Sequence, residues 1–400
     1  MRLGINHSAW WGPPKKFDPN FRERRISWLE LFYDLVYVIA ISRITHHLSL
    51  HITPGGFLEY ACLFVLIFWG WLNGSLYHDI HGNEGLRTRL MTLWQMMIIA
   101  ALAITIDQSP GGSYTNTTVV FMLMQFFITY LWWSVGFYDR DHRKYNMPYT
   151  ILFLIALGLM GLSLVVESNW LKLIVPLILV CNYTPPFIAH RVLRRSSLDL
   201  SLSSSMSERL GLFTIIVFGE VVLGVVNGVS RIPTPGFSVW LDFALAVSIV
   251  FALWWIFFTL TSNREAKKGF IRASILELLC LPTLMSLGLI AACYSWLFKP
   301  EDGLKSLQAA FGFALAIFLA GVSLIMGFLE YPEIVPPIMK PVRISLFVTA
   351  LVFLVGSMIN LNLDTTYFLI AVIIILVAEI SYLNSLYYKL GIEEVAGGSQ

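Results

Sequence analysis

Several acidic residues of this chain lie inside long apolar runs, where an ionisable side chain is costly. Glu220 is the deepest of them in its run, SERLGLFTIIVFGEVVLGVV, and small residues at helical spacing after it would let another helix approach closely. Near the middle of a bilayer a charged side chain costs roughly 2.5–3.5 kcal/mol on insertion scales, so it must be protonated, paired or facing water. Glu220 is therefore predicted to be the titrating carboxylate of a polar pathway. A neutral glutamic acid bonded to a neighbouring helix is the alternative.

A second acidic group, Glu30 and Asp34, lies in the first apolar run, SWLELFYDLVYVIAISRITHHL. Residues four apart share one face of a helix, and Tyr37 and Ile41 continue the same stripe. Two carboxylates this close in a medium of low dielectric do not both ionise easily, which favours a proton relay or a cation site. Alternatively, Glu30 complements the helix dipole or pairs with the arginines just before it.

Other polar residues in the apolar runs have weaker claims. Arg43 and Glu59 lie at the same predicted side of the membrane, and a structural ion pair between them is preferred to a gating role. Glu379 begins a polar stripe in the last run, which either lines a pathway or joins helices. His78 and His81 have no third ligand at a characteristic spacing, so no metal site and no cofactor is predicted.

The composition is that of a membrane protein. Hydrophobic residues make up 57% of the chain and charged residues 13%, whereas about a quarter of a soluble domain is charged. A net charge of +2 gives no reason to expect nucleic-acid binding. The chain has no phosphate-binding loop, GxSxG elbow or HExxH motif, so neither an ATP-driven pump nor an enzyme is expected. The expected partners are the lipid bilayer and a small solute or ion.

Twelve apolar runs approach the ~20 residues that a helix needs to cross a bilayer. They predict an all-α polytopic protein with both termini in the cytoplasm. The Lys and Arg residues outside the runs support this topology, because nearly all of them fall on the predicted cytoplasmic side. The runs are 28–48, 57–77, 88–106, 117–138, 147–166, 170–190, 208–228, 239–261, 273–298, 306–328, 341–361 and 366–388.

The chain is expected to consist of two six-helix halves with basic cytoplasmic segments around them. A weak internal repeat places Leu31-Phe32 over Leu212-Phe213, each followed by aliphatic residues. An even number of helices in each half makes such repeats parallel, as in some transporters. The expected parts are an N-terminal segment (1–27), a first half (28–192), a linker (193–207), a second half (208–388) and a tail (389–400).

Two motifs, WLELFYDLVYV at 28–38 and ERLGLFTIIVFGE at 208–220, resemble those of the bacterial low-temperature-requirement A (LtrA) family. The resemblance extends over almost the whole chain. It implies a multi-pass protein of the bacterial inner membrane, linked by name to growth in the cold and without a settled substrate. It adds Glu208 and Arg209 to the residues of interest, with anchoring or capping of the helix as their expected role. Where the family usually carries a histidine, this chain has Ser205.

The leading hypothesis is a secondary transporter coupled to protons. Glu220 would titrate at its centre, and Asp34 and Glu30 would form a relay or cation site between the first and seventh runs. One alternative is a passive cation channel, because Phe32-Tyr33-Asp34 is similar to a signature of endolysosomal potassium channels built from two six-helix repeats. The other is an accessory membrane protein that supports growth in the cold through lipid or partner contacts, without transport.

Overall fold

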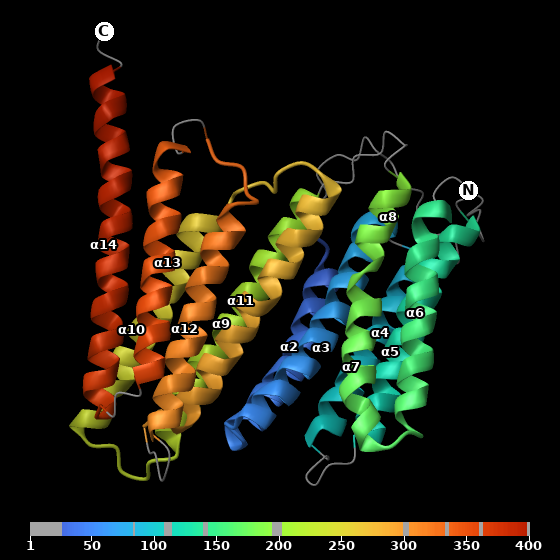
Figure 1. Ribbon diagram of the computed structural model, residues 1–400, viewed down its shortest axis with the longest axis horizontal. Coiled ribbons are helices and arrows are strands. Elements are labelled where there is room, and N and C mark those ends of the chain that lie inside the picture. The colour runs from blue at the N-terminus through green and yellow to red at the C-terminus, as the bar shows by residue number, and fades with distance from the viewer. Residues whose placement is uncertain are drawn as a thin grey trace, which may run out of the picture. The chain divides into compact units, whose positions relative to one another are not determined.

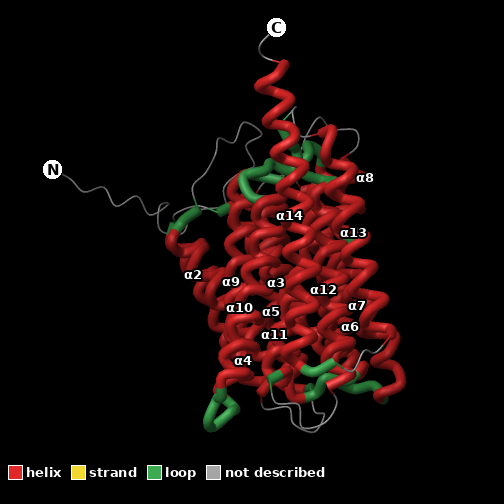
Figure 2. Tube along the Cα trace, turned by 90° about the vertical axis from the view of Figure 1, so that its left-hand side faces the viewer, coloured by secondary structure: helices red, strands yellow, loops and turns green. Residues whose placement is uncertain are grey.

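The computed structural model is built almost entirely of α-helices (Figure 1). In the parts of the chain that it describes there is no strand, and only Ala266 and Leu329 form an isolated antiparallel bridge (Figure 2). Helices are expected here, because a segment in a bilayer must satisfy its backbone hydrogen bonds internally. The described residues are 26–82, 85–107, 114–138, 143–193, 202–298, 304–332, 336–359 and 363–397.

The chain divides into two compact units. The first contains Met1–His47, Leu58–Phe213 and Lys268–Ser274, and the second contains Leu48–Phe57, Thr214–Lys267 and Ile275–Gln400. The predicted repeat of two halves stays a prediction.

In the first unit α6 packs against α5, α7 and α8, and α4 packs against α5. Aromatic rings fill the contacts: Trp132 of α5 stacks on Tyr149 of α6 with ring centroids 4.4 Å apart, and Trp69 of α3 meets Phe153 of α6 edge-on at 5.1 Å. The end of α2 and the start of α3 belong to the second unit. The helices of the first unit are α2 (Trp28–Leu50), α3 (Pro54–His81), α4 (Leu86–Asp107), α5 (Thr115–Tyr138), α6 (Arg143–Ser163), α7 (Ser168–Tyr183) and α8 (Pro185–Leu193).

In the second unit α12 packs against α13 and α10 against α14, with further contacts of α13 with α14 and of α10 with α12. Its helices, of which α9 and α11 begin in the first unit, are α9 (Ser204–Ser230), α10 (Phe237–Thr261), α11 (Phe270–Leu297), α12 (Leu304–Met326), α13 (Pro336–Ile359) and α14 (Thr365–Gly397).

The predicted close approach of a helix to the glycines of the seventh run is confirmed. A Cβ atom added to Gly224 would overlap the backbone of Ala291, and one added to Gly228 would overlap the backbone of Tyr294. Both contacts bring α11 against α9, which only small residues permit. Gly219 has no atom within 4 Å of an added Cβ and is not part of this contact.

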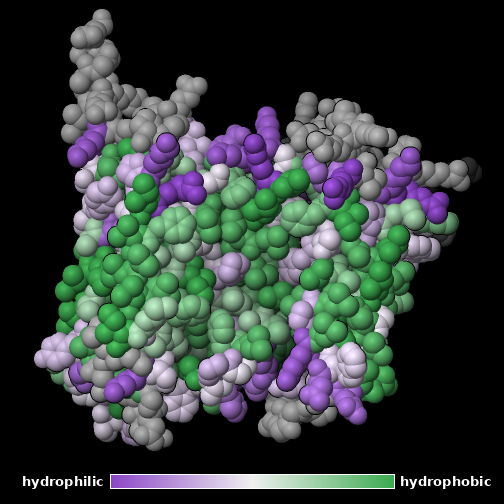
Figure 3. Space-filling view, viewed as in Figure 1, coloured by the Kyte–Doolittle hydropathy of each residue, from purple (hydrophilic) through white to green (hydrophobic). Residues whose placement is uncertain are grey.

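The prediction of an all-α polytopic membrane protein is confirmed. Ten of the described helices are long and apolar enough to cross a membrane, or eleven if α7 and α8, bent by 45° at their junction, form one span. Hydrophobic side chains cover the middle parts of the visible helices, and hydrophilic ones gather toward their ends (Figure 3). α2, which carries Glu30, Asp34 and Arg43, is not among the ten, so the number of twelve spans stays a prediction.

α2 has one apolar exposed face and one buried polar face. Phe32, Leu35 and Ile39 are exposed, at the spacing of one helix face. The predicted stripe from Glu30 through Asp34 and Tyr37 to Ile41 is buried along its whole length. The first unit therefore has polar side chains of α2 in its interior.

Candidate functional site: a buried ion pair between α2 and α9

The centre of the site is an ion pair between Asp34 of α2 and Arg209 of α9. Arg209 Nη2 donates to Asp34 Oδ1 at 2.5 Å and Arg209 Nε donates to Asp34 Oδ2 at 3.2 Å, which is the bidentate geometry of a guanidinium with a carboxylate. The two residues are 0% and 2% exposed, respectively. Both charges are therefore removed from solvent and balance each other inside the first unit.

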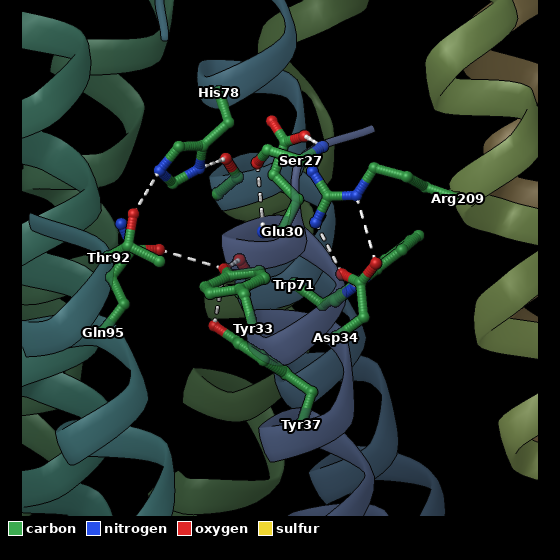
Figure 4. A network of polar contacts seen from close by, with 12 residues as sticks. Ser27, Glu30, Tyr33, Asp34, Tyr37, Trp71, His78, Thr92, Gln95 and Arg209 are labelled. Carbon is green, nitrogen blue, oxygen red and sulfur yellow. Dashed lines mark hydrogen bonds and ion pairs between the residues drawn. The ribbon is translucent and has the colours of Figure 1, made fainter. Parts of the chain in front are cut away.

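Trp71 of α3 completes the donors around Asp34. Its indole Nε1 donates to Asp34 Oδ1 at 2.7 Å. The indole stacks on Phe213 of α9 with ring centroids 4.3 Å apart, and this contact fixes its plane. The guanidinium of Arg209 lies 5.7 Å from the ring centre of Tyr33 and 5.9 Å from that of Trp71, within the range of cation–π attraction. Two helices, α3 and α9, thus hold the carboxylate of α2 with three N–H donors (Figure 4).

The first turn of α9 positions Arg209. Ser203 caps the helix by accepting a hydrogen bond from the backbone N–H of Met206 at 3.0 Å. Ser203 also donates to Asp79 of α3 at 2.6 Å, and Ser205 donates to the other oxygen of Asp79. Because Ser205 and Arg209 are four residues apart, they share a face of α9, so the contact with α3 sets the rotation of the helix that presents Arg209.

Glu30 closes the start of α2. The backbone N–H of Ser27 donates to Glu30 Oε2 at 2.9 Å, and the backbone N–H of Glu30 donates to Ser27 Oγ at 3.3 Å. This reciprocal arrangement is a capping box, which satisfies two N–H groups at the start of a helix. Glu30 thus has a structural role in α2, and its predicted part in a relay stays a prediction. The proposed pairing with the arginines before it concerns residues outside the described ranges.

A chain of uncharged polar groups lies along the buried face of α2 and centres on Tyr33, the residue before Asp34 (Figure 4). The Tyr33 hydroxyl lies 3.0 Å from Gln95 Oε1, 3.1 Å from the Tyr37 hydroxyl and 3.4 Å from the carbonyl oxygen of Gly70. It has one hydrogen to donate to three acceptors, and Tyr37 in turn donates to Met124 Sδ at 3.5 Å. The hydroxyl of Tyr33 can therefore change its acceptor without any movement of the backbone.

His78 of α3 lies beside this chain, with its ring centre 5.8 Å from that of Tyr33. Its Nδ1 is 2.7 Å from the carbonyl oxygen of Gly74 and must donate there, because a carbonyl oxygen only accepts. Its Nε2 is 2.6 Å from Thr92 Oγ1. Within the described residues no group of three metal-ligating side chains is found.

The structure brings together only some of the residues predicted for the site. Asp34 and Arg209 pair in the first unit, Tyr37 lies on the same buried face of α2 and contacts Tyr33, and Glu30 lies one turn before Asp34. The expected role of Arg209 as an anchor or cap is corrected, because its guanidinium is buried and paired with Asp34. Glu208, the residue before it, is exposed.

The other predicted residues lie elsewhere. Glu220 is half-buried in α9. Glu379 of α14 is buried and accepts hydrogen bonds from Ser345 at 2.7 Å and Thr349 at 2.8 Å, both on α13. These bonds join two helices, so the packing interpretation of Glu379 has direct support, and its role in a pathway stays a prediction.

Glu59 lies beside His47 and Tyr114. Its Oε1 is 3.0 Å from Nε2 of His47, and burial together with the hydrogen bond to Glu59 raises the pKa of Tyr114, just before α5. Arg43 is exposed, and its pairing with Glu59 stays a prediction.

Sequence reasoning missed Trp71, Gln95 and His78 as members of the site. Gln95 had a usable signal, because a primary amide within an apolar run must also find partners. Trp71 and His78 had none, because aromatic residues are common at membrane interfaces and in helix contacts.

The chain is similar to bacterial proteins. Residues 25–379 match the family model described as the bacterial low temperature requirement A protein (LtrA). An uncharacterized protein of Rhizobium meliloti (strain 1021) is 24% identical over 278 residues, which cover 67% of this chain and 65% of that protein. With the apolar helices described above, the match makes this a multi-pass membrane protein.

Proposed function

Because the chain belongs to the bacterial LtrA family and buries an ion pair among apolar helices, we propose that it is a proton-coupled secondary transporter of a small solute. The proposal excludes an enzymatic role, and its setting is the inner membrane with both termini in the cytoplasm. The family is named for a low-temperature requirement, and this name does not identify the transported solute.

The observation that carries the proposal is the buried pair of Asp34 and Arg209. Taking two charges out of water costs several kcal/mol per ion, and apolar residues of similar volume often stabilise a core equally well or better. Charges held inside a membrane bundle commonly mark solute or proton pathways. A pair that can open when the carboxylate is protonated is a two-state element of the kind that a transport cycle requires.

Glu220 keeps its proposed role as the central titrating carboxylate. Arg209 and Glu220 are separated by about three helical turns and so lie on nearly the same face of α9. In the proposed cycle Glu220 titrates, and Asp34 and Glu30 form a relay on the cytoplasmic side. The hydroxyl of Tyr33, whose ring lies 5.7 Å from the guanidinium of Arg209, can switch between three acceptors during the cycle.

The test is a flux assay on purified protein in liposomes with an internal pH dye and imposed proton, sodium and potassium gradients. The wild-type protein should move protons when a mixture of small solutes is added. The substitutions Asp34→Asn and Glu220→Gln should abolish this movement. The matched control is Asp364→Asn, at an exposed carboxylate before α14, which should transport normally.

Three results would contradict the proposal. Ion leak in the absence of solute, at rates above those of a carrier, would indicate the channel. Silence under every gradient, together with full rescue of cold growth by both neutral variants, would indicate the accessory protein. Loss of folded Glu220→Gln protein would indicate a structural glutamate.

A further inference from the structure

Asp34 occupies a receptor that would fit any carboxylate. Its two oxygens accept three N–H groups, two from Arg209 and one from Trp71. Each of these donors comes from a helix other than α2. A bidentate guanidinium with an added N–H donor is a common way for proteins to bind a free carboxylate. Two aromatic rings lie beside the guanidinium, and Arg209 is almost fully buried.

The receptor has donors that Asp34 does not use. Arg209 Nη1 is buried and has no acceptor in the described part of the chain, although the guanidinium carries five N–H donors. Gln95 Nε2, on the far side of Tyr33, is likewise buried without an acceptor among the described residues. Both unsatisfied groups are donors, so an acceptor-rich ligand would satisfy them and a cation would not.

The charges decide what can replace Asp34. The guanidinium of Arg209 stays charged at all ordinary pH values, whereas a carboxylate can be neutralised by one proton. The titratable groups that face Asp34 are Glu30, Tyr33 and Tyr37 on α2, Arg209 on α9, and His78 on α3 next to Tyr33. Only Arg209 among them is a permanent cation. If Asp34 is protonated, Arg209 needs another anion.

We propose that Arg209 and Trp71 bind the carboxylate of the transported solute in exchange for that of Asp34, which takes up one proton as it leaves. The proposal rests on the proposed transport function and adds the class of substrate. One O–H bond forms at Asp34, and the ion pair of Arg209 changes its carboxylate. One monocarboxylate and one proton enter together, so the charge of the site is the same before and after binding. Uptake of a monocarboxylate is then driven by a pH gradient and not by membrane voltage.

The first experiment measures binding without transport. Wild-type protein in detergent is titrated with acetate, lactate, benzoate, succinate and glutamate, and ligand-induced thermal stabilisation is recorded between pH 5 and 8. At least one carboxylate should stabilise the protein. The affinity of the protein for that carboxylate should fall about tenfold for each unit by which the pH rises, because one proton is taken up with each anion. The methyl ester of the same acid, which has no charge, should give no shift.

Variants separate the roles of the two residues. Asp34→Asn has no internal anion and takes up no proton, so it should bind the carboxylate at least ~10-fold more tightly at pH 7.5, with no dependence on pH. Arg209→Gln should not bind. If either single variant fails to fold, Asp34→Leu combined with Arg209→Met leaves no buried charge, and it should fold without binding. Binding by this double variant would overturn the proposal.

Measurements of binding and of flux together distinguish a wrong substrate class from a wrong transport function. If no carboxylate binds, while flux of a cation or neutral solute still depends on Asp34, transport stands and the substrate class is wrong. If carboxylates bind through Arg209 but no flux is found with them, the receptor stands and transport is wrong. Binding that is independent of pH in the wild type would refute the exchange of partners.

Discussion

Breaking the ion pair from one side should cost much more stability than removing it altogether. Asp34 is 0% exposed and Arg209 is 2% exposed, so either charge left alone has almost no access to solvent. In Arg209→Met the carboxylate keeps only the bond from Trp71, and in Asp34→Leu the guanidinium loses both of its acceptor contacts. Each single substitution should therefore lower the free energy of unfolding by about 3–5 kcal/mol.

The double variant should be nearly as stable as the wild type. Leucine and methionine fill much of the same volume and need no hydrogen-bond partner, so the loss should be about 1 kcal/mol or less, and a gain is expected if packing is good. The coupling free energy between the two sites is then at least ~5 kcal/mol, the sum of the two single losses minus that of the double variant. It is measured as a double-mutant cycle from SDS titrations in mixed micelles, followed by circular dichroism.

The reasoning would be refuted if each single substitution lowered the free energy of unfolding by less than about 1 kcal/mol and the two losses added. Such a result would show that water or another part of the chain already compensates each charge. The same three proteins also separate stability from function. A double variant that is stable but inactive in the liposome assay assigns the pair to transport. One that is stable and fully active assigns it to helix packing.

Four further predictions test the supports of the site and of the second unit. Gly224→Ala should destabilise the protein by about 1–3 kcal/mol through overlap with α11, whereas Gly219→Ala, with open space around it, should not; equal effects would contradict the close approach of these helices. Ser27→Ala should cost about 1 kcal/mol and speed hydrogen exchange in the first turn of α2, and unchanged exchange would show that the capping box does not hold that turn. Glu379→Gln keeps one acceptor for the hydroxyls of α13 and should leave flux unchanged, so lost flux in a folded variant would place Glu379 in a pathway. Gly74→Ala should weaken both stability and flux, because its Cβ would overlap the hydroxyl of Tyr33; normal flux would exclude that hydroxyl from the cycle.

The depth of a charged residue along an apolar run was a partial guide to the site. It ranked Glu220 above Asp34, yet Asp34 is fully buried in a network and Glu220 is half-buried. Depth measures position along the helix axis and not the direction of the side chain. The stripe of residues on one face of α2 predicted better which side chains point inward, because the face of a residue follows from the helix period alone.

The class of the protein, the positions of the helices and the buried face of α2 could be predicted from the amino-acid sequence alone. These properties depend on local composition and on periodicity within a single helix, since a bilayer requires apolar runs of a certain length. The pairing of Arg209 with Asp34, 175 residues earlier in the chain, and the hydrogen bond from Trp71 to the same carboxylate became visible only in the packed helices. The partner of a buried charge depends on the rotation and depth at which helices pack. Those are set by contacts such as that of Ser205 with Asp79, which the pattern of a single helix does not contain.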